Sequence, residues 1–131
     1  MIRYYDMDGV LADFNAEPNA VERFANEKNF FKNLQPIQPR VDYVRHLIGK
    51  GADVRVISAS PNKRADKDKM AWLSKYLPEL TKDKIYFCRI GENKAHKVKD
   101  LHKAILFDDY GKNCREWLDA GGLQAIKIEP K

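Results

Sequence analysis

The sequence predicts an α/β fold: a three-layer, Rossmann-like core around a mainly parallel sheet of five strands. Short apolar runs alternate along the chain with longer amphipathic stretches, as in successive βαβ units. The run over 104–107 is continuously apolar, which is typical of a strand covered on both faces. A length of 131 residues without repeats or linkers suits one domain over 1–131.

In the first part of the chain, apolar spacing and proline positions define the elements. A strand is expected over 2–6, which is rich in β-branched and aromatic residues. A short helix is expected over 20–27, within an irregular stretch that Pro36 and Pro39 close. Pro39 also suits the first turn of the next helix, because its missing N–H costs little there, and Gly51 ends that helix.

The second part of the chain continues the alternation. A strand over 54–58 ends at Ser58, and a charged helix over 64–77 follows. Met70, Leu73 and Leu77 lie on one face of this helix, which predicts that they are buried. The remaining elements are strands over 85–88, 104–107 and 123–128, and a short helix over 113–120.

Composition limits the partners and the cell compartment. The net charge of +5, from 24 basic and 19 acidic residues, favours anionic partners. Because the basic residues are spread along the chain, we expect a solvated basic surface; a nucleic-acid groove is possible but not favoured. No apolar run approaches the roughly 20 residues of a membrane span, and no long apolar stretch follows Arg3 as in a signal peptide. Two cysteines without CxxC spacing fit a reducing compartment, so we expect a cytoplasmic protein.

Carboxylates, a hydroxyl and an amine stand at the predicted strand ends and in the loop before the fourth strand: Asp6, Asp8, Ser58, Lys94, Asp108 and Asp109. Open parallel sheets bind ligands beyond the carboxyl ends of their strands, so these groups are expected to meet at one edge. Packed carboxylates raise each other's pKa, and a divalent cation removes that conflict. All-oxygen ligands suit Mg²⁺, whereas the absence of clustered His or Cys argues against zinc.

The spacing of the carboxylates adds detail. Asp6 and Asp8 stand at i and i+2, so both face one pocket if the extended geometry persists. Gly9 then permits a turn or a close approach to a ligand. Asp108 and Asp109 are adjacent, so a regular strand aims them apart. One is expected to bind the metal directly and the other through water or a hydrogen bond; the sequence leaves open which.

These residues resemble the motifs of the haloacid dehalogenase-like (HAD) phosphohydrolase superfamily, in its order and over nearly the whole chain. The segment 6–14 resembles the first motif, Ser58 the second, Lys94 the third and the pair at 108–109 the fourth. A narrower resemblance is to the 5'(3')-deoxyribonucleotidase branch and its small bacterial and phage relatives. The residues on which this narrower resemblance rests are 6–14, 57–62, 91–94, 106–110, Asn113, Trp117, Gly121, Gly122 and 126–127.

The resemblance implies a Mg²⁺-dependent phosphomonoester hydrolase, similar to 5'-nucleotidases, that acts on nucleoside monophosphates through an aspartyl-phosphate. Asp6 is then the nucleophile, and Asp8 is the general acid and base. The implied phosphate-binding residues are Ser58, Ala59 and Lys94. The implied metal ligands are Asp6, Asp8 through its backbone carbonyl, Asp108 and Asp109. Ser60 is the alternative to Ser58, and Lys97 and Lys99 are the alternatives to Lys94.

In that superfamily, cap insertions over the sheet edge select the substrate. The segment 15–39 is the sizeable candidate here, and it suits only a small helical cap. Phe30 and Phe31, with Phe14 at the base, either stack on a nucleobase or cover the core. Two other functions stay open: a phosphatase for a sugar phosphate or a nucleic-acid end, and a catalytically weak binding module with the same fold.

Overall fold

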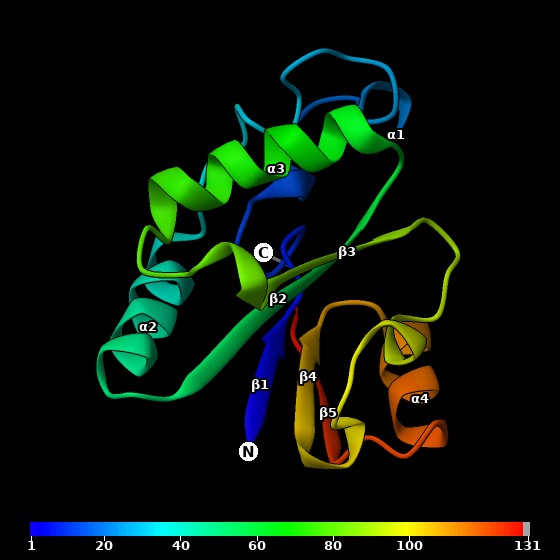
Figure 1. Cartoon of the computed structure of the whole chain (residues 1–131). Helices are drawn as coiled ribbons and strands as arrows, with labels where there is room; N and C mark the ends of the chain where they lie inside the picture. Colours follow the sequence, from blue (N-terminus) through cyan, green and yellow to red (C-terminus); the bar gives the residue numbers. More distant parts are fainter. Residues whose placement is uncertain (130–131) are drawn as a thin grey trace.

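The computed structural model describes residues 1–129; the last two residues of the predicted domain lie outside this range. Within it, five strands form one sheet in the order β3-β2-β1-β4-β5, and all neighbouring pairs are parallel (Figure 1). The strands are β1 Ile2–Tyr5, β2 Asp53–Ser60, β3 Ile85–Arg89, β4 Ala104–Asp108 and β5 Gln124–Lys127. The predicted parallel α/β sheet is confirmed.

Helices cover both faces of this sheet, which confirms the three-layer architecture (Figure 1). The α-helices are α1 Ala20–Arg23, α2 Gln38–Gly49, α3 Lys63–Tyr76 and α4 Gly111–Asp119. Short 3-10 turns are η1 Phe14–Ala16, η2 Lys82–Lys84, η3 Lys94–Lys97 and η4 Leu101–Lys103. Helices α2 and α3 pack on one face, while α4 and η3 pack on the other. Within residues 1–129, no helix is both long and apolar enough to cross a membrane.

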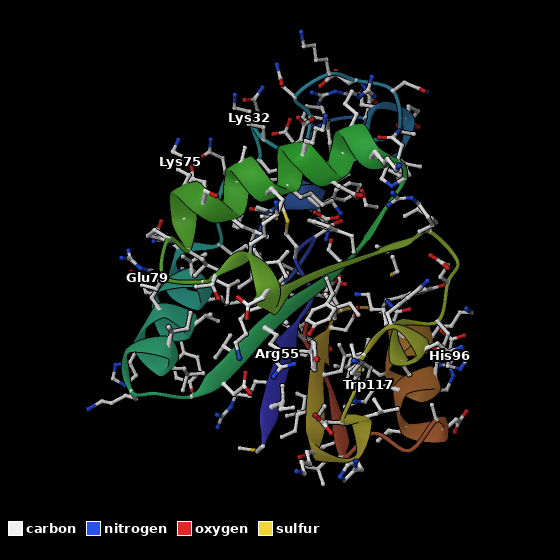
Figure 2. All side chains as sticks on the ribbon, in the orientation of Figure 1. Lys32, Arg55, Lys75, Glu79, His96 and Trp117 are labelled. Atoms are coloured by element: carbon white, nitrogen blue, oxygen red, sulfur yellow. The ribbon has the colours of Figure 1, made fainter. Side chains whose placement is uncertain are left out.

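Residue alternation along the strands divides the core between the two faces. In β1, Tyr5 joins the cluster under α2 and α3, while Tyr4 joins the cluster under α4. Trp117 of α4 lies against the sheet (Figure 2), and its indole Nε1–H donates to the carbonyl of Ala104 at 3.1 Å. A Cβ at Gly122 would overlap the Trp117 ring, so this close approach requires glycine. The Trp117 ring also lies 5.5 Å from that of Tyr4, so this side chain packs against both β1 and β4.

The segment 15–39, which the sequence predicts as a cap and which we call the cap segment, is closed at its base by backbone pairing. The N–H of Asp13 donates to the carbonyl of Gln35 at 2.8 Å, and the N–H of Ile37 donates to that of Leu11 at 2.7 Å. Inside it, the helix predicted over 20–27 is only Ala20–Arg23, followed by irregular turns. Its Asn19 cap makes no side-chain hydrogen bond, and so short a helix has little stability of its own.

Candidate functional site

The carboxylates of β1 and β4 meet at the carboxyl edge of the sheet. Tyr5 pairs with Phe107 in the register of the two strands, so Asp6 and Asp108 follow at the same level. Asp6, Asp108 and Asp109 each offer one carboxylate oxygen, and these oxygens all lie within 4.8 Å of one another. This separation is short enough for the three residues to share one cation.

Lys94 is the amine at this cluster. It lies on η3, is 2% exposed, and its Nζ donates to Asp6 Oδ1 at 2.9 Å and to Asp108 Oδ2 at 2.8 Å. The side chain of Asn93 accepts from the N–H of Ala95 and so caps the turn that carries Lys94. The alternatives lie outside the cluster, because Lys97 pairs with Glu92 at the surface and Lys99 is exposed.

The electrostatics of the cluster follow from burial and crowding. Burial raises the pKa of Asp6 well above its usual range, Lys94 opposes this, and the charges of Asp108, Asp8 and Asp109 add to it. Burial also raises the pKa of Asp109, against the hydrogen bond with Asp6. For Lys94, burial lowers the pKa, yet the attraction of Asp6 and Asp108 outweighs it and the net shift is upward. The single positive charge of Lys94 does not offset the negative charges of Asp6, Asp108 and Asp109, so a further cation fits here.

Asp108 and Asp109 occupy different environments. Asp108 is fully buried; its Oδ1 accepts from the N–H of Tyr110 at 2.9 Å, and its Oδ2 accepts from Asn113 at 3.1 Å as well as from Lys94. Asp109 is half-buried and lies against Gly9, where an added Cβ would overlap its Oδ2. Gly9 has φ +82, a conformation that favours glycine. The missing side chain therefore leaves room for the Asp109 carboxylate beside Asp6.

Asp8 belongs to a second group of contacts, centred on Lys69 of α3. Lys69 is fully buried, and its Nζ donates to Asp8 Oδ2 at 2.9 Å, to Ser58 Oγ at 2.8 Å and to the carbonyl of Ala59 at 2.7 Å. The same ammonium lies 4.3 Å from the centroid of the Phe31 ring. Asp8 Oδ1 is buried and has no hydrogen-bond partner among residues 1–129. One oxygen of Asp8 is thus held, and the other is left for a ligand or a proton.

Lys69 was not predicted from the sequence. The helical spacing predicted that Met70 is buried on α3, but Met70 is half-buried and Lys69 is fully buried, so that expectation is corrected. Lys75 of the same helix projects outward (Figure 2). The available signal was the spacing of Ala65, Trp72 and Leu73, which puts residue 69 inside the buried stripe.

The two hydroxyls at the end of β2 are buried, and the phosphate-binding role of Ser58 stays a prediction. The side chains of Ser58 and Ser60 are both fully buried, and Ser58 accepts from Lys69 while Ser60 donates to the carbonyl of Asn62 at 3.3 Å. Side chains alternate along a strand, so Ala59 faces the opposite way and borders a cavity together with Lys94. Ala59 thus borders the cavity with Lys94, whereas Lys69 holds the Ser58 hydroxyl and Asp8 together.

This cavity, which we call the core-loop cavity, has a volume of about 280 Å³. The loop after β3 and the start of α4, with Tyr110 before it, supply most of its walls, and none of residues 15–39 lines it. Its lining residues are Ala59, Ile90, Gly91, Glu92, Lys94, Tyr110, Lys112 and Asn113.

The cap aromatics pack against one another. Phe30 and Phe31 are each 2% exposed, with ring centroids 5.1 Å apart, and Phe14 lies 5.7 Å from Phe30. Phe24 completes the group at 6.1 Å from Phe14. Of the two interpretations open from the sequence, the structure supports the one in which these rings cover the core.

The family comparison agrees with this geometry. The model of the family described as 5' nucleotidase, deoxy (pyrimidine), cytosolic type C protein matches residues 15–125. The comparison with curated protein sequences found no match.

Solved structures show the same fold at low sequence identity. A chain of the Pnkp1/Rnl/Hen1 RNA repair complex has a TM-score of 0.71 at 14% identity, and a second structure of a Pnkp1/Rnl/Hen1 complex has 0.66 at 15%. Each match covers 97% of this chain but only 42% and 45% of those chains, so this chain spans less than half their length. The HAD domain of the effector protein Lem4 from Legionella pneumophila has a TM-score of 0.54 at 15% identity, covering 99% of this chain and 85% of that one.

Proposed function

The chain belongs to the family of cytosolic type C 5'-deoxynucleotidases within the HAD phosphohydrolases, and from this premise we propose that it is a Mg²⁺-dependent hydrolase of nucleoside monophosphates. One observation carries the proposal. Asp6, Asp108 and Asp109 present oxygens within 4.8 Å of one another, and Lys94 bonds both Asp6 and Asp108. Carboxylates gathered around one lysine suit a site that binds a cation and a phosphate together.

The donor set fits Mg²⁺, because it consists of oxygens and includes carboxylates that burial and crowding make costly to ionise. We assign Asp6, Asp109 and the backbone carbonyl of Asp8 as direct ligands. Asp108 already accepts from Tyr110, Lys94 and Asn113, so we assign to it the orientation of Lys94 and a ligand role through water. Mg²⁺ bound there offsets the negative charges of the nucleophile and the phosphate.

Asp6 is the proposed nucleophile. Its carboxylate attacks phosphorus, the bond from phosphorus to the ester oxygen breaks, and an aspartyl-phosphate forms. Lys94 and the backbone N–H of Ala59 hold the phosphate oxygens, and Lys94 balances their charge. Water then attacks the phosphorus of the aspartyl-phosphate, which releases phosphate and restores Asp6.

Asp8 is the proposed general acid and base. It protonates the leaving oxygen in the first step and takes a proton from the attacking water in the second. Asp8 Oδ1, which has no hydrogen-bond partner among the described residues, is the atom we assign to carry this proton. Lys69 holds the other oxygen of the carboxylate and so orients the group.

We propose a nucleoside monophosphate as the substrate and the cytoplasm as the location of the protein. Family membership supports a nucleoside monophosphate. A phosphorylated nucleic-acid end is the second candidate, because the net charge of +5 favours polyanions and the fold resembles a component of an RNA repair complex. The buried free thiols Cys88 and Cys114 support a cytoplasmic location.

The test replaces the nucleophile while keeping its shape. Asp6→Asn is expected to lower Mg²⁺-dependent release of phosphate from a nucleoside monophosphate by at least about 1,000-fold, because the amide cannot form the covalent intermediate. Exposed Asp119→Asn on α4 is the matched control and should keep full activity. A chelator should abolish wild-type activity and added Mg²⁺ should restore it. Retained turnover in Asp6→Asn would refute the mechanism.

A further inference from the structure

We infer that the cap segment takes part in proton transfer: the ring of Phe31 holds the ammonium of Lys69 in place, and Lys69 in turn orients Asp8. Phe31 and Lys69 are then positioning residues, which act on the reaction through the proposed general acid and base. The inference rests on the proposed function and gives the cap segment a part in the chemistry of the site.

The ammonium of Lys69 uses all of its donors inside the protein. It donates to Asp8 Oδ2 at 2.9 Å, to Ser58 Oγ at 2.8 Å and to the carbonyl of Ala59 at 2.7 Å. An ammonium has three N–H groups, so these acceptors match its full number of donors. Because Lys69 is also fully buried, the position of its ammonium determines where Asp8 finds a hydrogen bond.

The carboxylate of Asp8 is held at one oxygen. Oδ2 accepts from Lys69, whereas Oδ1 has no hydrogen-bond partner among residues 1–129. The side chain is 22% exposed, so packing does not enclose it completely. A carboxylate held in this way can rotate when its donor moves. The direction in which Oδ1 presents its proton therefore depends on how firmly Lys69 is held.

The ring of Phe31 stabilises Lys69 without competing for its protons. The ammonium lies 4.3 Å from the ring centroid, a distance at which the face of an aromatic ring attracts a cation. Phe31 is 2% exposed, so the contact is shielded from water. A smaller, non-aromatic side chain at position 31 would remove this attraction and leave space for water beside the ammonium. Water could then compete with Asp8 for the protons of Lys69.

The cap segment is attached to helix α3 on both sides of Phe31 in the chain, and it lies beside that helix in Figure 1. The indole N–H of Trp72 donates to the carbonyl of Leu34 at 2.9 Å. The side chain of Asn62, which caps α3, donates to the carbonyl of Ala25 at 3.1 Å. These two contacts keep the ring over the same helix that carries the ammonium.

Phe30 provides a matched control within the same aromatic cluster. It is also 2% exposed, and its ring centroid lies 5.1 Å from that of Phe31. The cation over its ring is the guanidinium of Arg23, at 5.1 Å, and not Lys69. The same substitution at the two positions therefore removes the same volume from the cluster, but only one of them removes the contact with Lys69.

The experiment compares two esters that differ in their need for a proton donor. The alcohol of thymidine 5'-monophosphate leaves with a proton, whereas 4-nitrophenolate leaves readily without one. Phe31→Leu should lower kcat/KM for the nucleotide by about 10-fold, a part of the roughly 100- to 10,000-fold that general acid–base catalysis contributes. For 4-nitrophenyl phosphate the loss should stay below about twofold, because this ester depends little on Asp8.

The matched variant shows whether the effect is more than a loss of packing. Phe30→Leu should leave the ratio of the two kcat/KM values as in the wild type, even if it lowers the stability of the cap segment. An equal loss on both esters in Phe31→Leu would overturn the inference. So would the same change of ratio in Phe30→Leu as in Phe31→Leu.

Proton exchange of the Lys69 ammonium, followed by ¹H–¹⁵N NMR without substrate, separates this inference from the proposed function. Exchange with water should be slow in the wild type and in Phe30→Leu, and at least about 10-fold faster in Phe31→Leu, because local opening then exposes the ammonium more often. If the wild type hydrolyses neither ester, the proposed function fails, while faster exchange confined to Phe31→Leu still supports the hold of Phe31 on Lys69. Wild-type exchange in Phe31→Leu would overturn the inference.

Discussion

At the scale of single residues, Lys94 joins two strands through one ammonium. Its contacts to Asp6 and Asp108 give it a role that the neighbouring lysines lack, since Lys97 and Lys99 are exposed. We expect Lys94→Ala to lower kcat at least about 100-fold, because removing one preorganised donor costs that much in comparable sites. Lys97→Ala and Lys99→Ala should stay within twofold of the wild type. Steady-state kinetics of the three variants test this, and equal losses would contradict the assignment.

Gly9 gives a prediction about the proposed cation site. In Gly9→Ala the new methyl group overlaps Asp109 Oδ2, so the carboxylate must move away from Asp6. We expect the Mg²⁺ concentration for half-maximal activity to rise about 10- to 100-fold, the usual cost of disturbing the surroundings of metal ligands.

The control for Gly9→Ala is Gly51→Ala. Gly51 has a similar φ of +86, but nothing lies within 4 Å of its added Cβ. This variant carries the backbone strain without the contact with Asp109. If both variants need the same Mg²⁺ concentration as the wild type, Asp109 is not the ligand that Gly9 accommodates.

The carboxylates and Lys94 could be identified from the sequence, because the carboxylates stand at or just after the end of a strand and Lys94 stands between two strands. The sequence did not separate Asp108 from Asp109, since that choice depends on donors from Tyr110 and Asn113. The phosphate contact of Ser58, which the family resemblance implies, stays a prediction; in the structure this hydroxyl is buried and accepts from Lys69. Which face of β2 meets the cavity depends on the packing of α3, and the local sequence pattern does not reveal it.

At the scale of elements, helix α3 contributes a buried charge to the site. Removing one partner of a buried ion pair typically costs about 3–5 kcal/mol, and the Asp8 side chain is 22% exposed, so the low end applies. We expect Lys69→Met to lower the free energy of unfolding by roughly 3 kcal/mol, measured by urea denaturation. Lys67→Met, on the exposed side of the same helix, should change it by less than about 0.5 kcal/mol. A Lys69→Met variant as stable as this control would show that the ammonium is dispensable for folding.

Helix α3 also shows why sequence reasoning fails at such positions. A lysine in an amphipathic pattern is assigned to the solvent face, because lysine is rarely buried without a partner. The partners here, Asp8 and Ser58, lie far away in the chain, and only the fold brings them to residue 69. The buried residues of helix α2 are apolar, so its pattern could be interpreted directly. Its predicted start at Pro39 and end near Gly51 agree with the structure.

At the scale of the whole molecule, the two thiols report on global unfolding. Cys88 and Cys114 are both buried, and burial raises the pKa of each thiol. A raised pKa lowers the fraction of reactive thiolate at pH 8, and burial also limits the access of a reagent to the two thiols. We therefore expect an aromatic disulfide reagent to react slowly with the native chain and rapidly once urea unfolds it. A native thiol that reacts as fast as free cysteine would contradict this packing.

The fold class and the parallel direction of the strands could be predicted, because continuous apolar runs such as 104–107 require cover on both faces. The strand order could not, since it depends on which crossovers pass on which side of β1. That order makes β1 the central strand with β4 beside it, and it therefore brings Asp6 next to Asp108.

The backbone pairing between 11–13 and 35–37 has a consequence for how such a protein can diversify. The two ends of the intervening segment are paired with each other, so the segment is attached to the core at a single junction. Longer or differently shaped inserts could be exchanged at this junction while the strands and the clustered carboxylates keep their places.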